Sequence, residues 1–353
     1  MQASKLLMVA LSGFSIGLIV AATPASSAPS APARIGVVQA ARPDAVSAPG
    51  GGQQTPTRSV TSVGATHSST TSVRLPAAEA AAAAAATLSP PATDRASKLL
   101  VIVEENETTR AYTQMPYLKS LSARYGTATR YTGLVHPSLG NYLVMVSGQG
   151  PGTCGLRDPL PAPCPQAGAT VFGRALSAGH PATTYAESMV TPCQTTNSTR
   201  YAARHNPWAY FTNERSVCKA HDVPMGTLTS GALRSDINAG TLPTVGMMVP
   251  NLVNDAHDGT LGQADAWLHT WLPQIMAGPD YRSGRLAVVI TFDEGTGANQ
   301  NVPFVVVHRS LSHKIVATRY THNSLSRLYT DVLGLSPLGA AATEPGLRAA
   351  FGI

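Results

Sequence analysis

Four short runs of apolar residues mark the chain after residue 97, and each of them stops abruptly at a polar residue or a proline. Runs of this length without alternation are typical of strands that are buried on both faces of a sheet. The predicted strands are 99–103, 244–249, 286–292 and 302–307. The residues that follow them are Glu104-Glu105-Asn106, Pro250-Asn251, Asp293-Glu294-Gly295 and His308.

Segments with helical character lie between these runs. The predicted helices are 115–125, 141–147, 263–276 and 323–333. Strands that alternate with helices indicate an α/β domain with a mainly parallel sheet. Ligands of such domains bind at the carboxyl ends of the strands, so the polar residues that end the apolar runs are the first candidates for function. Glu187, after a possible strand at 183–185, is a weaker candidate, because a solvated carboxylate also explains it.

The first 97 residues differ from the rest in composition. Lys5 and the apolar run at 6–22 have the layout of a secretory signal peptide, which we place at 1–28. A membrane anchor is the alternative, but the run is shorter than the ~20 apolar residues that a span needs. Residues 29–97 are rich in Ala, Ser, Thr, Pro and Gly, and we predict a disordered tail because they offer little apolar surface to bury. Residues 98–353 then form one domain.

The formal net charge of +6 is divided equally between residues 1–97 and residues 98–353. No cluster of Lys and Arg stands out, so the sequence gives no support for a nucleic-acid interface. A mild positive field would still help to collect anionic substrates.

The four cysteines all lie in the part predicted to be exported, where disulfides are expected. Three pairings are possible, and we favour the local one, Cys154–Cys164 with Cys193–Cys218. The spacings do not match a paired Cys-x-x-Cys zinc site, which argues against sulfur as a metal ligand.

Two strand ends offer ligands for a cation. Asp293 and Glu294 are adjacent carboxylates at the end of a very apolar strand, where their mutual repulsion would favour a bound metal ion. Glu105 and Asn106 place a carboxylate beside an amide oxygen, again a ligand set for a hard cation. The alternatives are an exposed acidic turn at Asp293 and a helix cap at Asn106.

Ser138 lies near the predicted start of a helix, where free backbone N–H groups favour an anion. That position suits a nucleophile that attacks phosphorus. The alternative is that the hydroxyl of Ser138 caps the helix, and position alone favours the cap.

Three histidines lie among polar residues at the ends of elements: His205, His257 and His322. Each could be a metal ligand or a proton donor. Asp255 and His257, two residues apart, could ligate a second metal, or His257 could protonate a leaving oxygen. Surface or core histidines without such a role are the alternative.

Five motifs occur in order along the domain, and together they resemble the bacterial phosphoesterase family of acid phosphatases and phospholipases C. The resemblance spans about residues 99–335. The motifs are Val-Glu-Glu-Asn at 103–106, His-Pro-Ser-Leu-Gly-Asn-Tyr at 136–142, Arg-His-Asn-Pro-Trp at 204–208, the segment 250–258, and Thr-Phe-Asp-Glu at 291–294.

The resemblance implies the alkaline-phosphatase superfamily fold, an α/β/α sandwich, and a phosphoryl-enzyme mechanism. It implies that Ser138 is the nucleophile and that Asn141, with His136 of the same motif, binds the substrate. His205 and His257 match histidines around the phosphate. The implied metal-binding positions are Glu105, Asn106, Asp293 and Glu294, with Asp255 and His322 as further candidates.

Three residues depart from the family pattern. Glu107 stands where a histidine is common, Gly140 where a proline is common, and Glu294 where many members have a second aspartate. The change at Glu107 could alter the choice of metal, and Gly140 could loosen the loop that carries Asn141.

These observations predict a secreted, metal-dependent phosphatase that hydrolyses phosphate monoesters through a phosphoserine. A phospholipase C-type phosphodiesterase and an inactive anion-binding module are the alternatives, and the tail leaves open retention at the cell wall. The expected substrates are phosphorylated small molecules or phospholipid headgroups. We expect a monomer without a membrane span after signal cleavage. Oxygen ligands favour Ca²⁺, Mg²⁺ or Mn²⁺, and histidine ligands would admit Zn²⁺ or iron.

Overall fold

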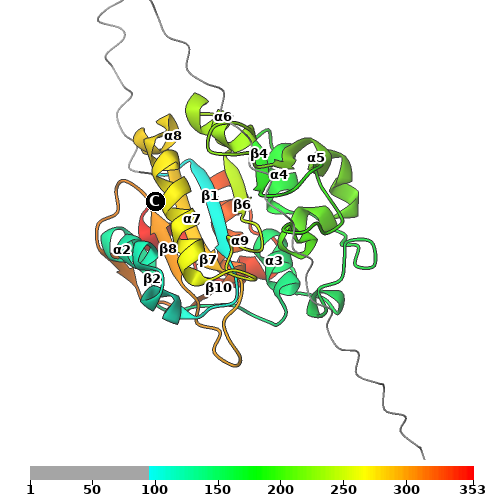
Figure 1. Cartoon of the computed structure of the whole chain (residues 1–353), viewed down its shortest axis with the longest axis horizontal. Helices are drawn as coiled ribbons and strands as arrows, with labels where there is room; N and C mark the ends of the chain where they lie inside the picture. The colour runs from blue at the N-terminus through cyan, green and yellow to red at the C-terminus, as the bar shows by residue number, and fades with distance from the viewer. Residues whose placement is uncertain (1–94) are drawn as a thin grey trace, which may run out of the picture. The chain divides into compact units, whose positions relative to one another are not determined.

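A computed structural model describes residues 95–353, so the predicted signal peptide and tail lie outside the described residues. An eight-stranded sheet forms the centre of the domain, in the order β5-β4-β6-β1-β7-β8-β2-β9 (Figure 1). Its strands are β1 (Lys98–Glu104), β2 (Gly126–Ala128), β4 (Ala182–Ala186), β5 (Asp222–Pro224), β6 (Val245–Val249), β7 (Leu286–Phe292), β8 (Phe304–Val307) and β9 (Lys314–Val316). A separate parallel pair joins β3 (Tyr131–Thr132) to β10 (Tyr320–Thr321).

The four predicted strands are confirmed as β1, β6, β7 and β8. Strand β1 lies between β6 and β7 and is parallel to both, so these three strands end at one edge of the sheet. Strand β8 differs, because it runs antiparallel to β7 and its last residue, Val307, pairs with Val288 near the start of β7. His308 therefore lies at the opposite edge, where its Nε2 is 2.8 Å from the carbonyl oxygen of Gly284.

Helices cover both faces of the sheet, which gives the predicted α/β/α arrangement. Helices α2 (Pro116–Arg124) and α7 (Leu261–Ala277) pack against each other, and α7 crosses in front of β1 in Figure 1. Helices α3 (Ser138–Ser147) and α9 (His322–Leu333) pack together, and α9 contacts β1 and β6. The remaining helices are α4 (Val171–Ser177), α5 (Arg215–His221), α6 (Ala232–Ala239), α8 (Pro279–Arg282) and α10 (Leu347–Phe351).

All four predicted helices are present, but α3 begins at Ser138 rather than at residue 141. Helix α7 begins with a capping box, in which the side chain of Thr260 accepts from the N–H of Gln263 and the Gln263 side chain accepts from the N–H of Thr260. Asp265 of α7 accepts hydrogen bonds from the first turn of α2, at the N–H groups of Tyr117 and Leu118. These local contacts fix the helices on one face relative to each other.

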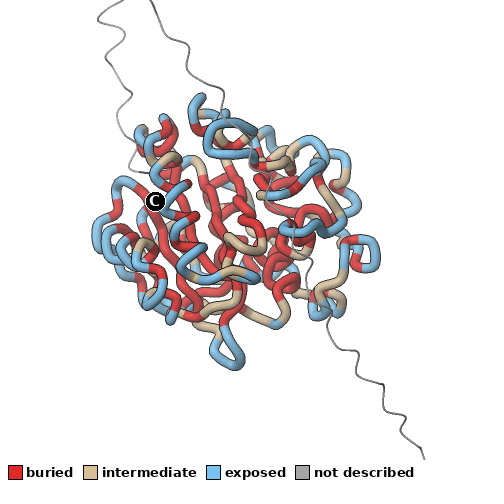
Figure 2. The backbone as a smooth tube through the Cα atoms, in the orientation of Figure 1, coloured by how far each residue is buried: buried red, intermediate tan, exposed pale blue. Residues whose placement is uncertain are grey.

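The core is continuous from the sheet into both helical layers (Figure 2). Every residue of β6 and β7 is buried, as the unbroken apolar runs predict. Within residues 95–353, no helix has both the length and the apolar character that a membrane span requires.

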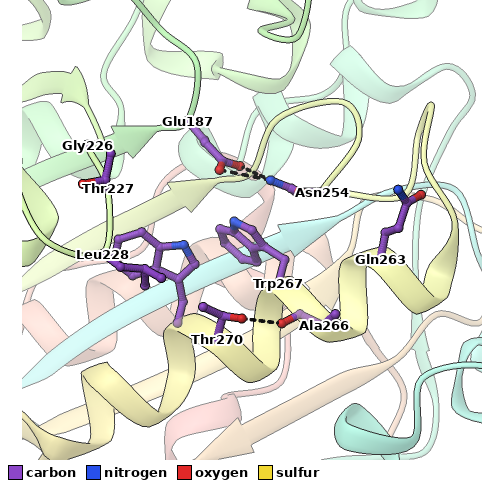
Figure 3. A pocket seen from close by; sticks show the side chains of 10 residues that line it. Glu187, Gly226, Thr227, Leu228, Asn254, Gln263, Ala266, Trp267 and Thr270 are labelled. Atoms are coloured by element: carbon purple, nitrogen blue, oxygen red, sulfur yellow. Dashed lines mark hydrogen bonds between the residues drawn. The ribbon is translucent and has the colours of Figure 1, made fainter. Parts of the chain in front are cut away.

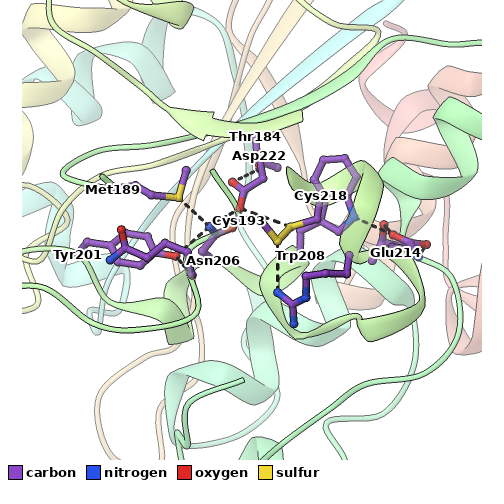
Figure 4. The surroundings of a disulfide bond; sticks show 12 residues. Thr184, Met189, Cys193, Tyr201, Asn206, Trp208, Glu214, Cys218 and Asp222 are labelled. Atoms are coloured by element: carbon purple, nitrogen blue, oxygen red, sulfur yellow. Dashed lines mark hydrogen bonds between the residues drawn. A yellow bond between two sulfur atoms is a disulfide. The ribbon is translucent and has the colours of Figure 1, made fainter. Parts of the chain in front are cut away.

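Two disulfides tie loops to the domain, and they are the local pairs Cys154–Cys164 and Cys193–Cys218. The second lies beside Asp222 and the segment that carries Asn206 (Figure 4). Because its sulfurs are bonded to each other, this group of Cys193, Cys218 and Asp222 is not a metal site, in line with the cysteine spacing.

Candidate active site

Adjacent parallel strands bring two of the predicted carboxylates together. Glu104 pairs with Phe292 in the register of β1 and β7, so Glu105 and Asp293 leave the sheet side by side. The N–H of Asn106 donates to Asp293 Oδ1 at 3.1 Å, and the Asn106 side-chain amide donates to Glu105 Oε2 at 3.2 Å. Glu105 and Asp293 are buried, whereas Asn106 is half-buried. Asn106 does not cap a helix, since the next helical turn is capped by Thr108.

Ser138 lies at the centre of this group, as the first residue of α3. Its Oγ donates to Glu105 Oε2 at 3.0 Å, and the residue is only 2% exposed. The residue before it, Pro137, is the N-cap and makes no side-chain cap. A side chain from outside the helix caps it instead: the carboxylate of Asp158 accepts from the N–H of Leu139 at 2.8 Å. The alternative of Ser138 as a helix cap is therefore wrong, and its hydroxyl faces the carboxylates.

A second chain of contacts runs from Glu105 to Asp255 through His205. His205 Nε2 is 3.2 Å from Glu105 Oε1, and its Nδ1 is 3.1 Å from Asp255 Oδ2. The three residues are buried, and their ligand atoms lie within 4.8 Å of one another. Burial lowers the pKa of His205 well below its ordinary value, and the charge of Arg204 adds to the effect. The contact of Nδ1 with Asp255 orients the buried imidazole, and Nε2, which makes no hydrogen bond, faces Glu105 Oε1.

Tyr142 is a site residue that the sequence analysis did not single out as a candidate. Its hydroxyl donates to Glu105 Oε1 at 2.7 Å, and its ring stacks on His205 with 5.2 Å between ring centroids. Its spacing from Ser138 could have identified it in the sequence. Residues four positions apart on a helix share a face, and Tyr142 lies four residues after Ser138.

His257 does not form the side-chain pair with Asp255 that the sequence suggested. Its Nε2 accepts from Arg204 Nη2 at 2.8 Å, and its Nδ1 is 2.7 Å from Asp258 Oδ1. Only the backbone N–H of His257 reaches Asp255, at 2.8 Å. The ring lies at the exposed rim, 5.6 Å from the His205 ring, so it can meet a ligand that enters from solvent.

Glu294 points away from its neighbour Asp293 into a separate group with Asn141 and His136. Its Oε1 is 2.9 Å from His136 Nδ1, and its Oε2 accepts from the Asn141 amide at 3.3 Å. The Asn141 oxygen accepts from the N–H groups of Leu134 and Val135 at 2.9 and 3.2 Å. Burial alone would lower the pKa of His136, but the bond to Glu294 outweighs it and raises the pKa.

His322 lies beside the site, and both of its ring nitrogens have protein partners. Nε2 contacts the carbonyl oxygen of Asp293, and Nδ1 is 2.9 Å from the hydroxyl of Tyr131. Burial lowers the pKa of His322 to about 4. The ring therefore supports the end of β7, and this position does not favour the predicted role as a metal ligand.

The departures at Gly140 and Glu107 have different surroundings. A Cβ atom at Gly140 would lie 2.7 Å from Val135 and 2.8 Å from Pro151, so the loop is packed closely against this glycine rather than loosened by it. Glu107 accepts hydrogen bonds from the N–H and hydroxyl of Thr108, at 2.8 and 2.9 Å.

The electrostatics of the carboxylate group favour a cation. Burial raises the pKa of Glu105 well above its ordinary value, and the charges of Asp293 and Asp255 raise it further. Burial likewise raises the pKa of Asp293 and of Asp255 to about 7. Asp293 Oδ2 is buried without a hydrogen-bond partner. Buried charges in proteins are paired or coordinate metals, and within residues 95–353 no Lys or Arg forms a salt bridge with Glu105 or Asp293.

The parallel sheet places a serine at a helix start beside acidic strand ends, an arrangement that suits the hydrolysis of phosphoric esters. The chain belongs to the Phosphoesterase family, whose sequence model matches residues 102–322.

Relatives and solved structures agree with this assignment. The chain is 29% identical over 258 residues to a phosphatidylinositol-3-phosphatase of Mycobacterium tuberculosis. This match covers 71% of this chain and 81% of the relative. It is 28% identical to a phosphate-repressible acid phosphatase of Penicillium chrysogenum over 40% of this chain, but that match spans only 34% of the fungal protein. In fold it is similar to an alkaline phosphatase superfamily protein of Vibrio parahaemolyticus, with a TM-score of 0.50, 11% identity, and coverage of 74% of this chain and 73% of the other.

Proposed function

We propose that residues 98–353 form an exported phosphatase that hydrolyses phosphate monoesters, with Ser138 as its nucleophile. The observation that carries the proposal is the position of the Ser138 hydroxyl, 3.0 Å from Glu105 Oε2. The group around it includes Asp293, which has one oxygen without a partner.

A divalent cation fits the same residues. Carboxylate oxygens of Glu105 and Asp293 and the amide oxygen of Asn106 would hold it next to Ser138, and all of these are hard ligands that suit Ca²⁺, Mg²⁺ or Mn²⁺. Such an ion lowers the pKa of a bound hydroxyl and offsets the charge of the phosphate. Glu294 stays outside this set because its carboxylate is bonded to His136 and Asn141.

The side chains around Ser138 have separate roles in the proposed reaction. The Ser138 oxygen attacks phosphorus and loses its proton toward Glu105, and the bond from phosphorus to the ester oxygen breaks. His257, at the exposed rim, gives a proton to the departing alcohol once its Nε2 has left Arg204 and taken up a proton, and it regains that proton from the water that attacks the phosphoserine. Tyr142 and Asn106 donate to Glu105 and keep it in position, and His205, oriented by Asp255, turns its Nε2 toward the same carboxylate. Water then hydrolyses the phosphoserine, which releases phosphate and restores the hydroxyl.

The test compares the wild type with Ser138→Ala and with Ser147→Ala, a matched control on the same helix. The Ser147 hydroxyl donates to the carbonyl oxygen of Leu143 and lies at the far end of α3. We expect p-nitrophenyl phosphate hydrolysis to fall at least about 10⁴-fold in Ser138→Ala and to persist in Ser147→Ala. Mass spectrometry of acid-quenched wild type should find phosphate on Ser138. Equal hydrolysis by Ser138→Ala and wild type would exclude this serine as the nucleophile.

The substrate panel separates this proposal from its alternatives. The mycobacterial relative is named for a phosphorylated lipid, so the panel includes phosphatidylinositol 3-phosphate beside p-nitrophenyl phosphate. Release of phosphate from these monoesters, with no cleavage of p-nitrophenyl phosphorylcholine, supports a phosphatase. Cleavage of the diester alone would indicate a phospholipase C, and no turnover with any added metal would indicate an anion-binding module.

Export is part of the proposal. Two disulfides within the described residues support it, because disulfides form and persist in oxidising compartments. Culture fractionation tests it, since we expect the mature chain in the medium. Recovery in the cytoplasm alone would contradict export, and recovery in the cell wall would indicate retention there.

A further inference from the structure

A cavity of about 490 Å³ lies between the first half of α7 and the loop that follows β5 (Figure 3). Its volume falls in the range of small-molecule sites. None of the residues that we assign to phosphate chemistry lines it. The cavity nevertheless adjoins the candidate active site, because Asn254 lines it and the next residue, Asp255, contacts His205.

Two indole rings form the apolar side of the cavity. Trp267 and Trp271 lie one turn apart on α7, with 6.4 Å between ring centroids. They are 8% and 3% exposed, so most of their surface is already covered by protein. Leu228, 40% exposed, lies on the facing loop. Aromatic faces in an otherwise polar pocket suit a ligand with both C–H surfaces and polar groups.

The polar side of the cavity has one unused donor and one carboxylate. Trp267 Nε1 is buried and has no hydrogen-bond partner, although an indole N–H inside a protein normally finds an acceptor. Glu187 Oε1 and Oε2 accept from the Asn254 amide at 3.0 and 2.9 Å, and Oε2 also accepts from the N–H of Asn251. A carboxylate has about four lone-pair sites, and these three hydrogen bonds leave room for one more donor to Glu187. Figure 3 shows the Trp267 nitrogen on the side of Glu187 and Asn254.

The facing loop is already ordered. The N–H of Thr227 donates to the carbonyl oxygen of Ser230 at 2.7 Å, which closes a tight turn. Gly226 has φ +88°, and a Cβ atom there would lie 2.5 Å from the Cα of Gly231, so only glycine fits this close approach. Because this loop is already ordered, little conformational entropy is lost there when a ligand binds.

We propose that this cavity is a binding site for a polyhydroxylated ring, a sugar or a cyclitol. A ring hydroxyl is both an acceptor and a donor, so it can accept from Trp267 Nε1 and donate to Glu187. The C–H face of the ring then packs on the indoles. A quaternary ammonium would also suit aromatic walls and a carboxylate, but it accepts no hydrogen bond and would leave the indole N–H unpaired. The inference goes beyond the phosphate chemistry and does not depend on it.

The experiment is saturation-transfer NMR on the purified protein with myo-inositol, glucose and choline as separate probes. We expect transfer from the protein to the ring protons of at least one of the two polyols, with a dissociation constant on the order of 1 mM. Glu187→Gln and Trp267→Phe should each weaken binding about tenfold, because each loses one strong hydrogen-bond partner. Myo-inositol alone would indicate a cyclitol site, and glucose alone a sugar site.

His269→Gln is the matched control, because His269 lies on α7 but packs on Tyr117 outside the cavity. It should bind as the wild type does, and the thermal unfolding midpoint of each variant shows whether it is folded. Glu187→Gln keeps an oxygen for the Asn254 amide, so it remains informative if Trp267→Phe does not fold. The inference is overturned if neither polyol receives saturation at about 100 mM, if choline alone does, or if folded Glu187→Gln binds with unchanged affinity.

Discussion

At the amino ends of β1 and β7 a buried carboxylate is matched with two cations, whereas at the carboxyl ends of the same strands buried carboxylates face one another. Asp280 is 1% exposed, and it lies 2.8 Å from Lys98 Nζ and 2.8 Å from Arg285 Nη2. Its Oδ2 also accepts from the N–H of Leu242. At the other ends, no Lys or Arg within the described residues forms a salt bridge with Glu105 or Asp293, and the neighbour of Glu105 is His205, whose pKa is lowered by burial.

The difference separates a stabilising arrangement from a functional one. A paired and hydrogen-bonded carboxylate has little left to offer a ligand, and breaking the pair leaves an uncompensated buried charge. A group of buried carboxylates without a Lys or Arg partner is costly to the folded state even when it accepts hydrogen bonds, and such groups gather at functional sites, where a ligand completes them. The same residue type therefore has opposite consequences at the two edges of the sheet.

Among the changes that test this comparison, Asp293→Asn should give the largest effect. We expect kcat/KM for p-nitrophenyl phosphate to fall about 10³-fold, because one charge of the proposed cation site is lost. Stability should stay the same or rise, since the repulsion with Glu105 is relieved. Steady-state kinetics and thermal unfolding check both parts. A large loss of stability together with full specific activity would show that Asp293 stabilises the fold and does not take part in the reaction.

Chelation should show which edge of the sheet binds a cation. We expect treatment with EDTA to lower activity about 100-fold and the return of one of Ca²⁺, Mg²⁺, Mn²⁺ or Zn²⁺ to restore it. The restoring metal at 100 times its dissociation constant stabilises by about 2.7 kcal/mol, or about 5 °C in the unfolding midpoint. The shift should shrink in Asp293→Asn. An equal shift in the variant would place the metal elsewhere.

Asp280→Asn should have the opposite pattern. We expect the free energy of unfolding to fall by about 2–3 kcal/mol, because Lys98 and Arg285 lose their shared partner and Arg285 is partly open to solvent. Specific activity per folded molecule should be unchanged, because Asp280 lies at the far edge of the sheet. Urea unfolding and titration of active protein measure the two quantities. Lost activity in a protein of normal stability would contradict the assignment.

Asp222 is a third kind of buried carboxylate, which accepts its side-chain hydrogen bonds from neutral groups. Thr184 Oγ1 donates to it at 2.5 Å and the Asn206 amide at 2.8 Å (Figure 4). Burial raises the pKa of Asp222 from 3.8 to about 7. The folded state therefore holds this proton longer than the unfolded state, so its contribution to stability is complete below about pH 4 and is lost as the pH rises to about 7.

Asp222→Asn should remove this pH dependence. Between pH 5 and 8 we expect the wild type to lose about 2 kcal/mol more stability than the variant does, as measured by urea unfolding. Other raised carboxylates contribute to both proteins and cancel in the difference. If the free energy of unfolding depends on pH in the same way in both proteins, Asp222 ionises in the folded state without a loss of stability.

The sequence predicts the central strands well because burial on both faces leaves an unbroken apolar run, as in Leu286–Phe292. It does not reveal the direction of a strand, so the antiparallel β8 and the position of His308 at the far edge were not foreseen. The edge strands β5 and β9 have three residues each, too few for a periodic signal.

The site follows the same rule. Glu105, Asp293 and Ser138 could be found because they lie next to recognisable strand and helix ends. The partners of side chains depend on tertiary packing, which spacing does not encode. His257 is two residues from Asp255, yet it is His205, fifty residues away, whose ring contacts the Asp255 carboxylate. Glu294 diverges from Asp293 for the same reason.

The two disulfide loops meet beside the candidate active site. Asp158, which caps α3, lies between Cys154 and Cys164, and Arg204 and His205 lie between Cys193 and Cys218. Arg204 Nε is 3.4 Å from Asp158 Oδ2, so each loop supports the other. A thiol reductant added to an assay buffer would therefore loosen the segments that carry Asp158 and His205, and we expect activity to fall. For the same reason we expect protein produced in a reducing cytosol to be less active until it is reoxidised.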